Sequence, residues 1–255
     1  MLTVSLLADF AIRLSFGLIL ALILTPWREV PPRFFRIQNQ VILGTLVLAA
    51  LDQARSSGPS LALWLVIAGA VLAYLASISW GLGLPRFGIA AGILGVLITA
   101  TWLVDASRSE DVGLWALNAL SRSASGLLLG ATLTAMLLGH YYLIAPSMTI
   151  EPLKRSLNLI VAGLIARSLL AGIGMWVAKV GLFALGSGGH ASDTTFIAMR
   201  WGMGFVGAAV SVYLARRTVE IRSTQSATGI LYITSIFVLF GELTSIVGAG
   251  SGAAC

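Results

Sequence analysis

Two stretches of the sequence, 109 positions apart, place an arginine inside an apolar segment at the same distance from a carboxylate or an amide. Residues 9–20 (DFAIRLSFGLIL) and residues 118–129 (NALSRSASGLLL) share the pattern [Asp/Asn]-x3-Arg-x3-Gly-Leu-x-Leu. A guanidinium inside a bilayer is costly unless a carboxylate, a ligand or water compensates its charge. The motif therefore predicts a buried ion pair or an anion-binding site, and its repetition indicates a duplicated membrane unit.

Polar side chains at several other apolar positions complete a candidate site for ligand binding or for a buried polar network. Four of its members are arginines and two are acids, so the set is net cationic. A net cationic set suits an anionic or strongly hydrogen-bond-accepting ligand. The candidate residues are Asp9, Arg13, Asn118, Arg122, His140, Tyr141, Arg167, Arg200 and Glu242.

The same charges can instead pair with one another and only hold the helices together. Asp9 and Arg13 are four residues apart, which places them on one helix face. Arg122 can reach Asp105 or Glu242 across helices, because all three are expected in the outer half of the membrane. Arg167 is expected near the middle of its segment, where the sequence offers no acid. Both interpretations, a structural network and a ligand site, remain open.

His140 is the histidine within an apolar segment, and two tyrosines follow it. Neutral imidazole and phenol groups donate hydrogen bonds, so His140 with Tyr141 or Tyr142 suits the carbonyl of a quinone or a proton-handling role. A purely structural histidine is the alternative. A transmembrane haem with two histidine ligands is disfavoured, because His190 lies in an external loop. The lone Cys255 predicts no metal site and no iron–sulfur cluster.

The composition requires elements that lie in lipid. Hydrophobic residues make up 58% of the chain, charged residues make up 10%, and the mean hydropathy is +0.95. We therefore expect an all-α integral membrane protein, because continuous apolar runs of this length cross a bilayer as helices. Eight transmembrane helices are expected, at about residues 4–25, 38–54, 61–81, 87–104, 114–145, 156–185, 196–215 and 227–247.

Basic residues predict the orientation of the chain. The loops after the first, third, fifth and seventh spans carry nine of them, whereas the opposite side carries Arg55 and Arg108. The positive-inside rule places the basic loops in the cytoplasm and both termini outside, in a cell inner (cytoplasmic) membrane. The net charge of +6 is thus a topology signal and predicts no nucleic-acid partner. The nine residues are Arg28, Arg33, Arg36, Arg86, Lys154, Arg155, Arg216, Arg217 and Arg222.

Weaker matches extend the repeat to the later spans. Residues 70–76 (AVLAYLA) resemble residues 209–215 (AVSVYLA), and a Gly-Ile-Leu triplet recurs at 92–94 and 229–231. We expect two parallel four-helix halves, residues 1–105 and 106–255, with Asp105 opposite Glu242. An even number of helices per half keeps both halves in the same orientation. The growing offset between matches predicts insertions between the fifth and seventh helices.

Short loops and buried arginines favour a membrane subunit of a multi-protein redox complex. Such a subunit is non-catalytic by itself or contributes a quinone- or lipid-binding site, and its partners are the bilayer and other membrane or redox subunits. Eight helices in two halves without haem ligands are similar to the NrfD-like quinone-binding anchors of bacterial reductases, by architecture and not by any residue motif. The alternative is a small carrier for an anionic or lipidic solute, since carriers often combine duplicated halves with a polar site between them. The motifs typical of intramembrane enzymes are missing from the sequence.

Overall fold

The computed structural model describes residues 5–145, 148–185 and 198–250, without the side chains of residues 57, 178–185 and 248–250. Within these ranges the chain is helical and has no strands, as the composition predicts. His190 and Cys255 lie outside the described residues. The elements are α1 (Leu6–Leu24), α2 (Pro32–Ser57), α3 (Leu61–Gly81), α4 (Pro85–Asp105), α5 (Val112–Ile144), α6 (Glu151–Leu185), the π-helix η1 (Arg200–Gly207), α8 (Ala208–Glu220) and α9 (Thr224–Gly250).

Among the described residues, seven helices are long and apolar enough to cross a membrane. The eighth expected span is divided between η1 and α8, where the backbone stays helical at the junction between Gly207 and Ala208. Several boundaries differ from the expected ones. Thus α2 begins at Pro32 rather than at residue 38, because proline is favourable in the first turn of a helix.

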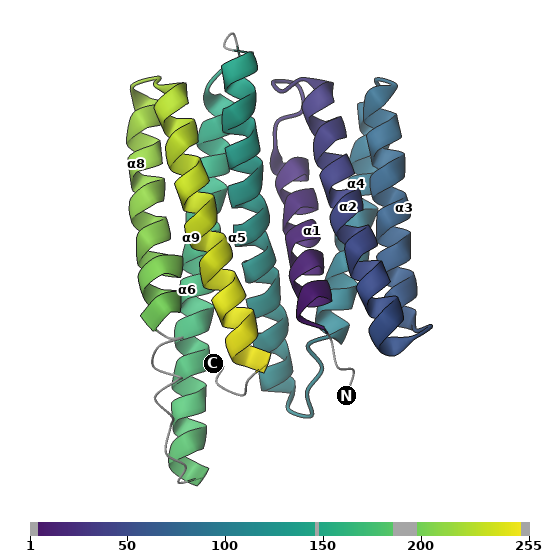
Figure 1. Ribbon diagram of the computed structural model, residues 1–255, viewed down its shortest axis with the longest axis vertical. Coiled ribbons are helices and arrows are strands. Elements are labelled where there is room, and N and C mark those ends of the chain that lie inside the picture. Colours follow the sequence, from purple (N-terminus) through teal and green to yellow (C-terminus); the bar gives the residue numbers. More distant parts are fainter. Residues whose placement is uncertain (1–4, 146–147, 186–197, 251–255) are drawn as a thin grey trace.

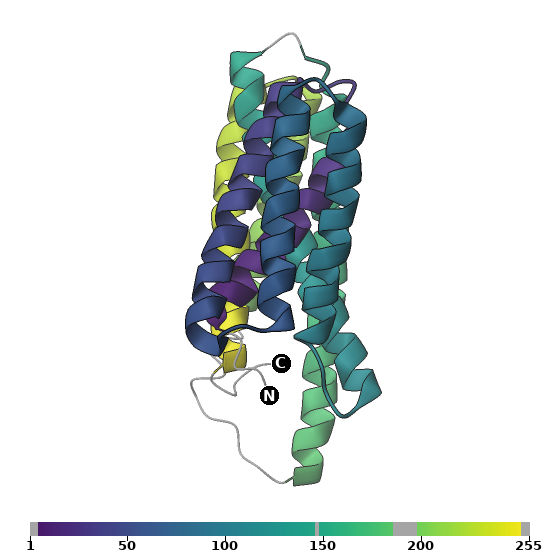
Figure 2. The ribbon, with the colours of Figure 1, turned by 90° about the vertical axis from the view of Figure 1, so that its right-hand side faces the viewer.

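The helices run side by side with alternating direction (Figure 1). The connections after α1, α3, α5 and α8 therefore lie at one end of the bundle. The nine basic residues singled out in the sequence all lie in these connections or in the helix turns beside them, and we call this the basic end. The described chain starts and stops at the opposite end (Figures 1 and 2).

The helices form two groups with the same neighbour relations. In the first quartet α1 contacts α2 and α4, α2 contacts α3, and α3 contacts α4. In the second quartet α5 contacts α6 and α9, α6 contacts α8, and α8 contacts α9. The two quartets meet chiefly through α1 and α5.

Glycines allow α1 and α5 to meet backbone to backbone. A Cβ atom on Gly17 would lie 1.7 Å from the carbonyl oxygen of Gly126, and one on Gly130 would lie 1.9 Å from the carbonyl carbon of Gly17. Larger residues would push the helices apart, which is why small residues line close helix contacts in membranes. Gly17 and Gly126 are the glycines of the repeated motif. The seam between the quartets is therefore formed by the two copies of that motif.

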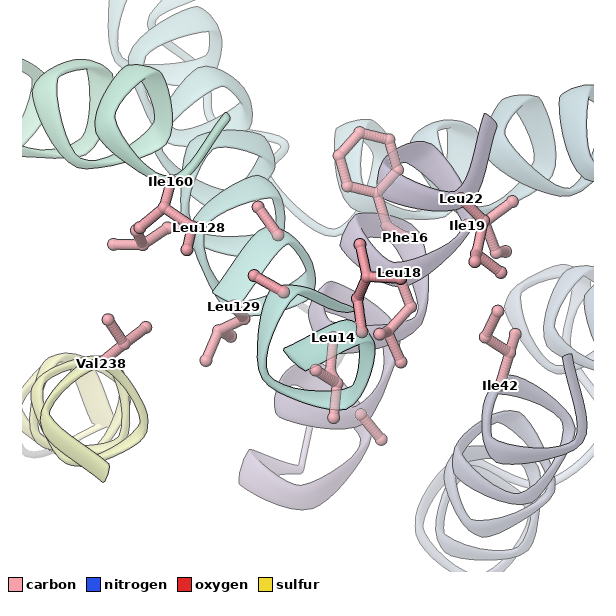
Figure 3. Close-up of a cluster of buried hydrophobic side chains, with 14 of the residues drawn as sticks. Leu14, Phe16, Leu18, Ile19, Leu22, Ile42, Leu128, Leu129, Ile160 and Val238 are labelled. Carbon is pink, nitrogen blue, oxygen red and sulfur yellow. The ribbon is translucent and has the colours of Figure 1, made fainter. Parts of the chain in front are cut away.

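Buried apolar side chains surround this seam. Leu14 and Leu18 of α1 lie on one side of α5, and Leu128 and Leu129 extend from the other side of α5 toward Ile160 and Val238 (Figure 3). Ile42 of α2 extends the core into the first quartet, and residues of α6 and α9 extend it into the second. The hydrophobic core thus runs through both quartets, and it positions the polar groups described next.

Candidate functional site

The first motif copy forms a buried ion-pair cluster with its counterpart in α5. Asp9 accepts hydrogen bonds from Arg13 Nη2 at 2.5 Å and from Arg122 Nη1 at 2.9 Å. The Asp9 and Arg13 side chains are each only 8% exposed, and the Arg122 side chain is 24% exposed. One carboxylate therefore compensates two guanidiniums, one from its own helix and one from across the seam.

A second buried ion pair joins α6 to α9. Arg167 Nε and Nη2 donate to the two carboxylate oxygens of Glu242 at 2.8 and 3.1 Å, and both side chains are almost fully buried. The remaining Arg167 donors reach the hydroxyls of Ser121 and Ser245 at 2.7 and 3.0 Å, while Ser125 donates to Glu242 at 2.6 Å. This bidentate geometry is the strong form of a charge-assisted hydrogen bond.

Helix α5 connects the two ion pairs. Ser121 and Ser125 are four residues apart and lie on one face of the helix, where they contact Arg167 and Glu242. Arg122 points instead to Asp9 on α1. We call these groups together the charge layer: Asp9, Arg13, Ser121, Arg122, Ser125, Arg167, Glu242 and Ser245.

The charge layer holds three guanidiniums against two carboxylates, so its formal charge is +1. Both oxygens of each carboxylate accept hydrogen bonds. Arg13 Nε is buried and has no hydrogen-bond partner within the described part of the chain. The arrangement can hold helices together, and its remaining positive charge can attract an anion.

Two expectations about the arginines are wrong. Arg122 pairs with Asp9 and not with Asp105 or Glu242; Asp105 forms an exposed ion pair with Arg108. Arg167 has an acid at its own depth, because α6 begins at the basic end and extends beyond the other helices at the opposite end (Figures 1 and 2). The middle of this long helix is therefore not the middle of the bundle.

Of the other predicted site residues, Asn118, His140 and Tyr141 lie outside the charge layer, whereas Arg200 lines the same small pocket as Glu242. Asn118 and His140 are exposed on α5. Tyr141 packs its ring edge-on against Phe34, with the ring centroids 5.9 Å apart. Arg200 is buried in η1, where its guanidinium lies 5.8 Å from the centre of the Phe205 ring.

His140 and the charge layer occupy different ends of α5. Arg122 and His140 are 18 positions apart, which corresponds to about 27 Å along a helix. Beside His140, the buried Tyr142 hydroxyl donates to the backbone carbonyl of Thr149 at 2.5 Å, which ties the end of α5 to the following loop. The structure therefore does not bring the histidine and the arginines together into one site.

Sequence reasoning missed the serines of the charge layer. Ser121 and Ser125 flank Arg122 at helical spacing, and that spacing was the available signal. Also missed was a further repeat, because it has another offset: residues 36–44 (RIQNQVILG) and 155–163 (RSLNLIVAG) share Arg-x2-Asn-x4-Gly at a distance of 119. These segments lie in α2 and α6, which have corresponding positions in the two quartets.

Within the described residues, no group of three or more His, Cys, Asp or Glu side chains is arranged to hold a metal ion. Comparison of the sequence with protein-family models and with curated proteins, and of the structure with solved structures, finds no match.

Proposed function

We propose that this protein is a polytopic membrane subunit of a multi-protein complex, non-catalytic by itself, and that the complex is redox- and quinone-linked. The observation that carries the proposal is the internal pairing of the charge layer. Asp9 and Glu242 are engaged by guanidiniums and hydroxyls of this same chain. This pairing supports a layer that fastens helices together in lipid, where an uncompensated charge would be costly.

We further propose that the two quartets arose by duplication of a four-helix unit. Motifs shared between α1 and α5, α2 and α6, α3 and α8, and α4 and α9 support this origin, as do the matching neighbour relations. The equivalent residues Gly17 and Gly126 touch at the seam, as expected for two like-oriented units related by an axis along the membrane normal. In this alignment the insertions of the second unit fall partly before α6 and partly between α6 and α8.

The quinone-linked part of the proposal depends on His140. Its imidazole is exposed on α5, a few residues before the helix ends at Ile144, with the half-buried Tyr141 beside it. An imidazole on the lateral surface at this depth is accessible to a quinone carbonyl or to a polar group of a partner subunit. His140 and Tyr141 therefore offer hydrogen-bond donors to a quinone or a partner subunit at a place that the charge layer does not reach.

We propose a cell inner membrane with the basic end in the cytoplasm and both termini outside. The grouping of the nine basic residues at one end of the bundle supports this orientation. The chain offers a direct test, because Cys255 is its single cysteine. A membrane-impermeant maleimide should label Cys255 in intact cells from which any outer membrane has been removed. Labelling only after lysis would reverse the orientation.

Purification in mild detergent tests the subunit proposal. We expect stoichiometric redox subunits in mass spectrometry and a quinone in the organic extract. The variant His140→Leu should lose the quinone, whereas His190→Leu, a change at the other histidine, should keep it. A lone protein without partners or quinone would contradict the proposal.

A carrier for an anionic solute is the second candidate, and the charge of +1 in the charge layer favours it. Arg122 is the most exposed arginine of the charge layer. In reconstituted vesicles Arg122→Gln should slow anion flux, while Arg55→Gln, an exposed arginine at the same end of the bundle, should not. Flux that is equal for the parent protein and for both variants would remove this candidate.

A further inference from the structure

A groove opens at the basic end between the first turns of α6 and the last turns of α8. Its volume is about 620 Å³. Lys154 and Asn158 of α6 form one wall, and Tyr213, Arg216 and Arg217 of α8 form the other. The groove thus presents three cations at the level where the helices leave the apolar part of the bundle.

Hydrogen bonds fix the two guanidiniums of the groove. Arg216 donates to the side-chain oxygen of Asn158 across the groove. Arg217 donates to the hydroxyl of Tyr213 and to the carboxylate of Glu220, both at 3.2 Å. Arginines held in this way have lost part of their conformational freedom before a ligand arrives, which favours binding.

The acids of the rim leave a positive balance. Glu220 is paired with Arg217, and Glu151 lies 4.0 Å from Arg155, which is outside the groove lining. Three cations against two carboxylates give the lining a formal charge of +1. Within the described part of the chain, Lys154 and Arg216 are therefore the groove cations whose charge is not matched by an ion pair with an acid.

The corresponding place in the first quartet is closed. There Phe35 of α2 stacks on Trp80 of α3, with ring centroids 4.3 Å apart. At the offsets of the α2–α6 and α3–α8 repeats, these positions hold Lys154 and Val219, and both residues line the groove. The second quartet thus lacks the aromatic pair that closes the first, and it carries a cation in place of one ring.

We propose that this groove binds the phosphate headgroup of an anionic phospholipid from the leaflet at the basic end. Guanidinium and ammonium groups are the donors that recognise phosphate in proteins. The buried side chains of Leu157 and Val219 line the groove beside the cations. The exposed apolar side chains of Val210 and Leu214 continue along α8, so an acyl chain can follow the helix surface while the headgroup contacts Lys154 and Arg216. The inference depends on insertion of the helices in a membrane but not on a quinone-linked complex.

Native mass spectrometry from mixed micelles tests this site. The full chain is equilibrated with phosphatidylglycerol and phosphatidylcholine in equal amounts, and the retained lipids are counted. We expect selective retention of phosphatidylglycerol. The variants Lys154→Gln and Arg216→Gln should each weaken retention about fivefold, since a basic residue near an anionic headgroup has an effect of that size. Arg33→Gln and Arg86→Gln remove the same charge from exposed positions elsewhere at the basic end and should change it little.

Three outcomes would overturn the proposal. Equal retention of both lipids would show that the groove does not select negative charge. Equal weakening by the groove variants and by the control variants would reveal a general surface effect. Displacement of phosphatidylglycerol by excess inorganic phosphate, with direct binding of that phosphate to the parent chain, would assign the groove to a soluble anion. All four substituted side chains are exposed, so the variants should fold, and their thermal unfolding should match that of the parent protein.

Discussion

In the first quartet an aromatic stack between Phe35 and Trp80 closes the α2–α3 contact, whereas in the second quartet a cationic groove opens between α6 and α8. The ends of the quartets opposite the basic end differ in the same sense. Asp105 of α4 is partly exposed and pairs with Arg108 at the surface, while its counterpart Glu242 of α9 is buried with Arg167. At both places the second quartet carries charged groups, in a groove or in a buried ion pair, where the first quartet has an aromatic stack or an exposed ion pair.

The seam between the quartets is formed by the sequence motif that both quartets share. Gly17 and Gly126 bring the two motif copies into contact, and the arginine of each copy reaches the same carboxylate, Asp9. Asn118, the residue that corresponds to Asp9 in the second copy, is exposed. One acid therefore serves both arginines, which leaves the layer with excess positive charge.

Glu242→Gln should have the largest effect on stability. The change leaves the buried Arg167 without its carboxylate, and breaking a buried pair in this way costs about 3–5 kcal/mol. Equilibrium unfolding in detergent micelles measures the loss. Asp105→Asn is the matched change in the first quartet and should cost at most about 1 kcal/mol, because its ion pair is exposed. Similar losses for both variants would erase the distinction between the quartets.

Gly17→Ala should have the next largest effect. Its methyl group would overlap the Gly126 carbonyl oxygen, and overpacking of this kind costs about 1–3 kcal/mol. The control is Gly44→Ala on α2, where no atom lies within 4 Å of the added carbon. The same unfolding measurement compares them. If Gly17→Ala were as stable as the control, α1 and α5 would not meet as closely as the seam requires.

Arg122→Gln should have a smaller effect, about 1 kcal/mol. Asp9 loses one of two guanidiniums but keeps Arg13, and the Arg122 side chain is partly exposed. Asp9→Asn should cost more than Arg122→Gln, since it leaves two cations facing each other. The order of the two unfolding free energies is the test, and the reverse order would show that Asp9 does not hold the seam.

Asn118→Ala should have the smallest effect, within about 0.5 kcal/mol, because the side chain is exposed. Thermal unfolding of this variant should coincide with that of the parent protein. A large loss would show that the second motif copy uses its amide as the first copy uses its carboxylate, and the asymmetry between the copies would disappear.

The sequence predicted the helical class and the local ion pair but not the contacts between distant helices. Asp9 and Arg13 could be paired because their spacing of four residues fixes their relative position on a helix. The ion pair between Arg167 and Glu242 could not be predicted in this way. The depth of Arg167 follows from where its helix begins and ends, and the expected span begins at residue 156, whereas α6 begins at Glu151 and ends far beyond the bundle.

Two further features depend on geometry that local patterns do not contain. The π-helix η1 interrupts an otherwise ordinary apolar span, and neither length nor hydropathy distinguishes the two helix types. The groove lies where the second quartet lacks the aromatic pair of the first quartet. The α2–α6 repeat is therefore needed to predict the groove from the sequence. That repeat has an offset of 119, which differs from the offsets of the other matches.

A double-mutant cycle on Arg167 and Glu242 tests most directly whether the buried charges serve to hold the helices together. The free energies of unfolding of Arg167→Met, Glu242→Met and the double variant are compared with that of the parent protein in the same micelles. We expect each single change to destabilise strongly and the double change to recover most of the loss, with a coupling of about 3 kcal/mol. Additive effects of the two changes would show that these side chains do not stabilise each other and would contradict a structural charge layer.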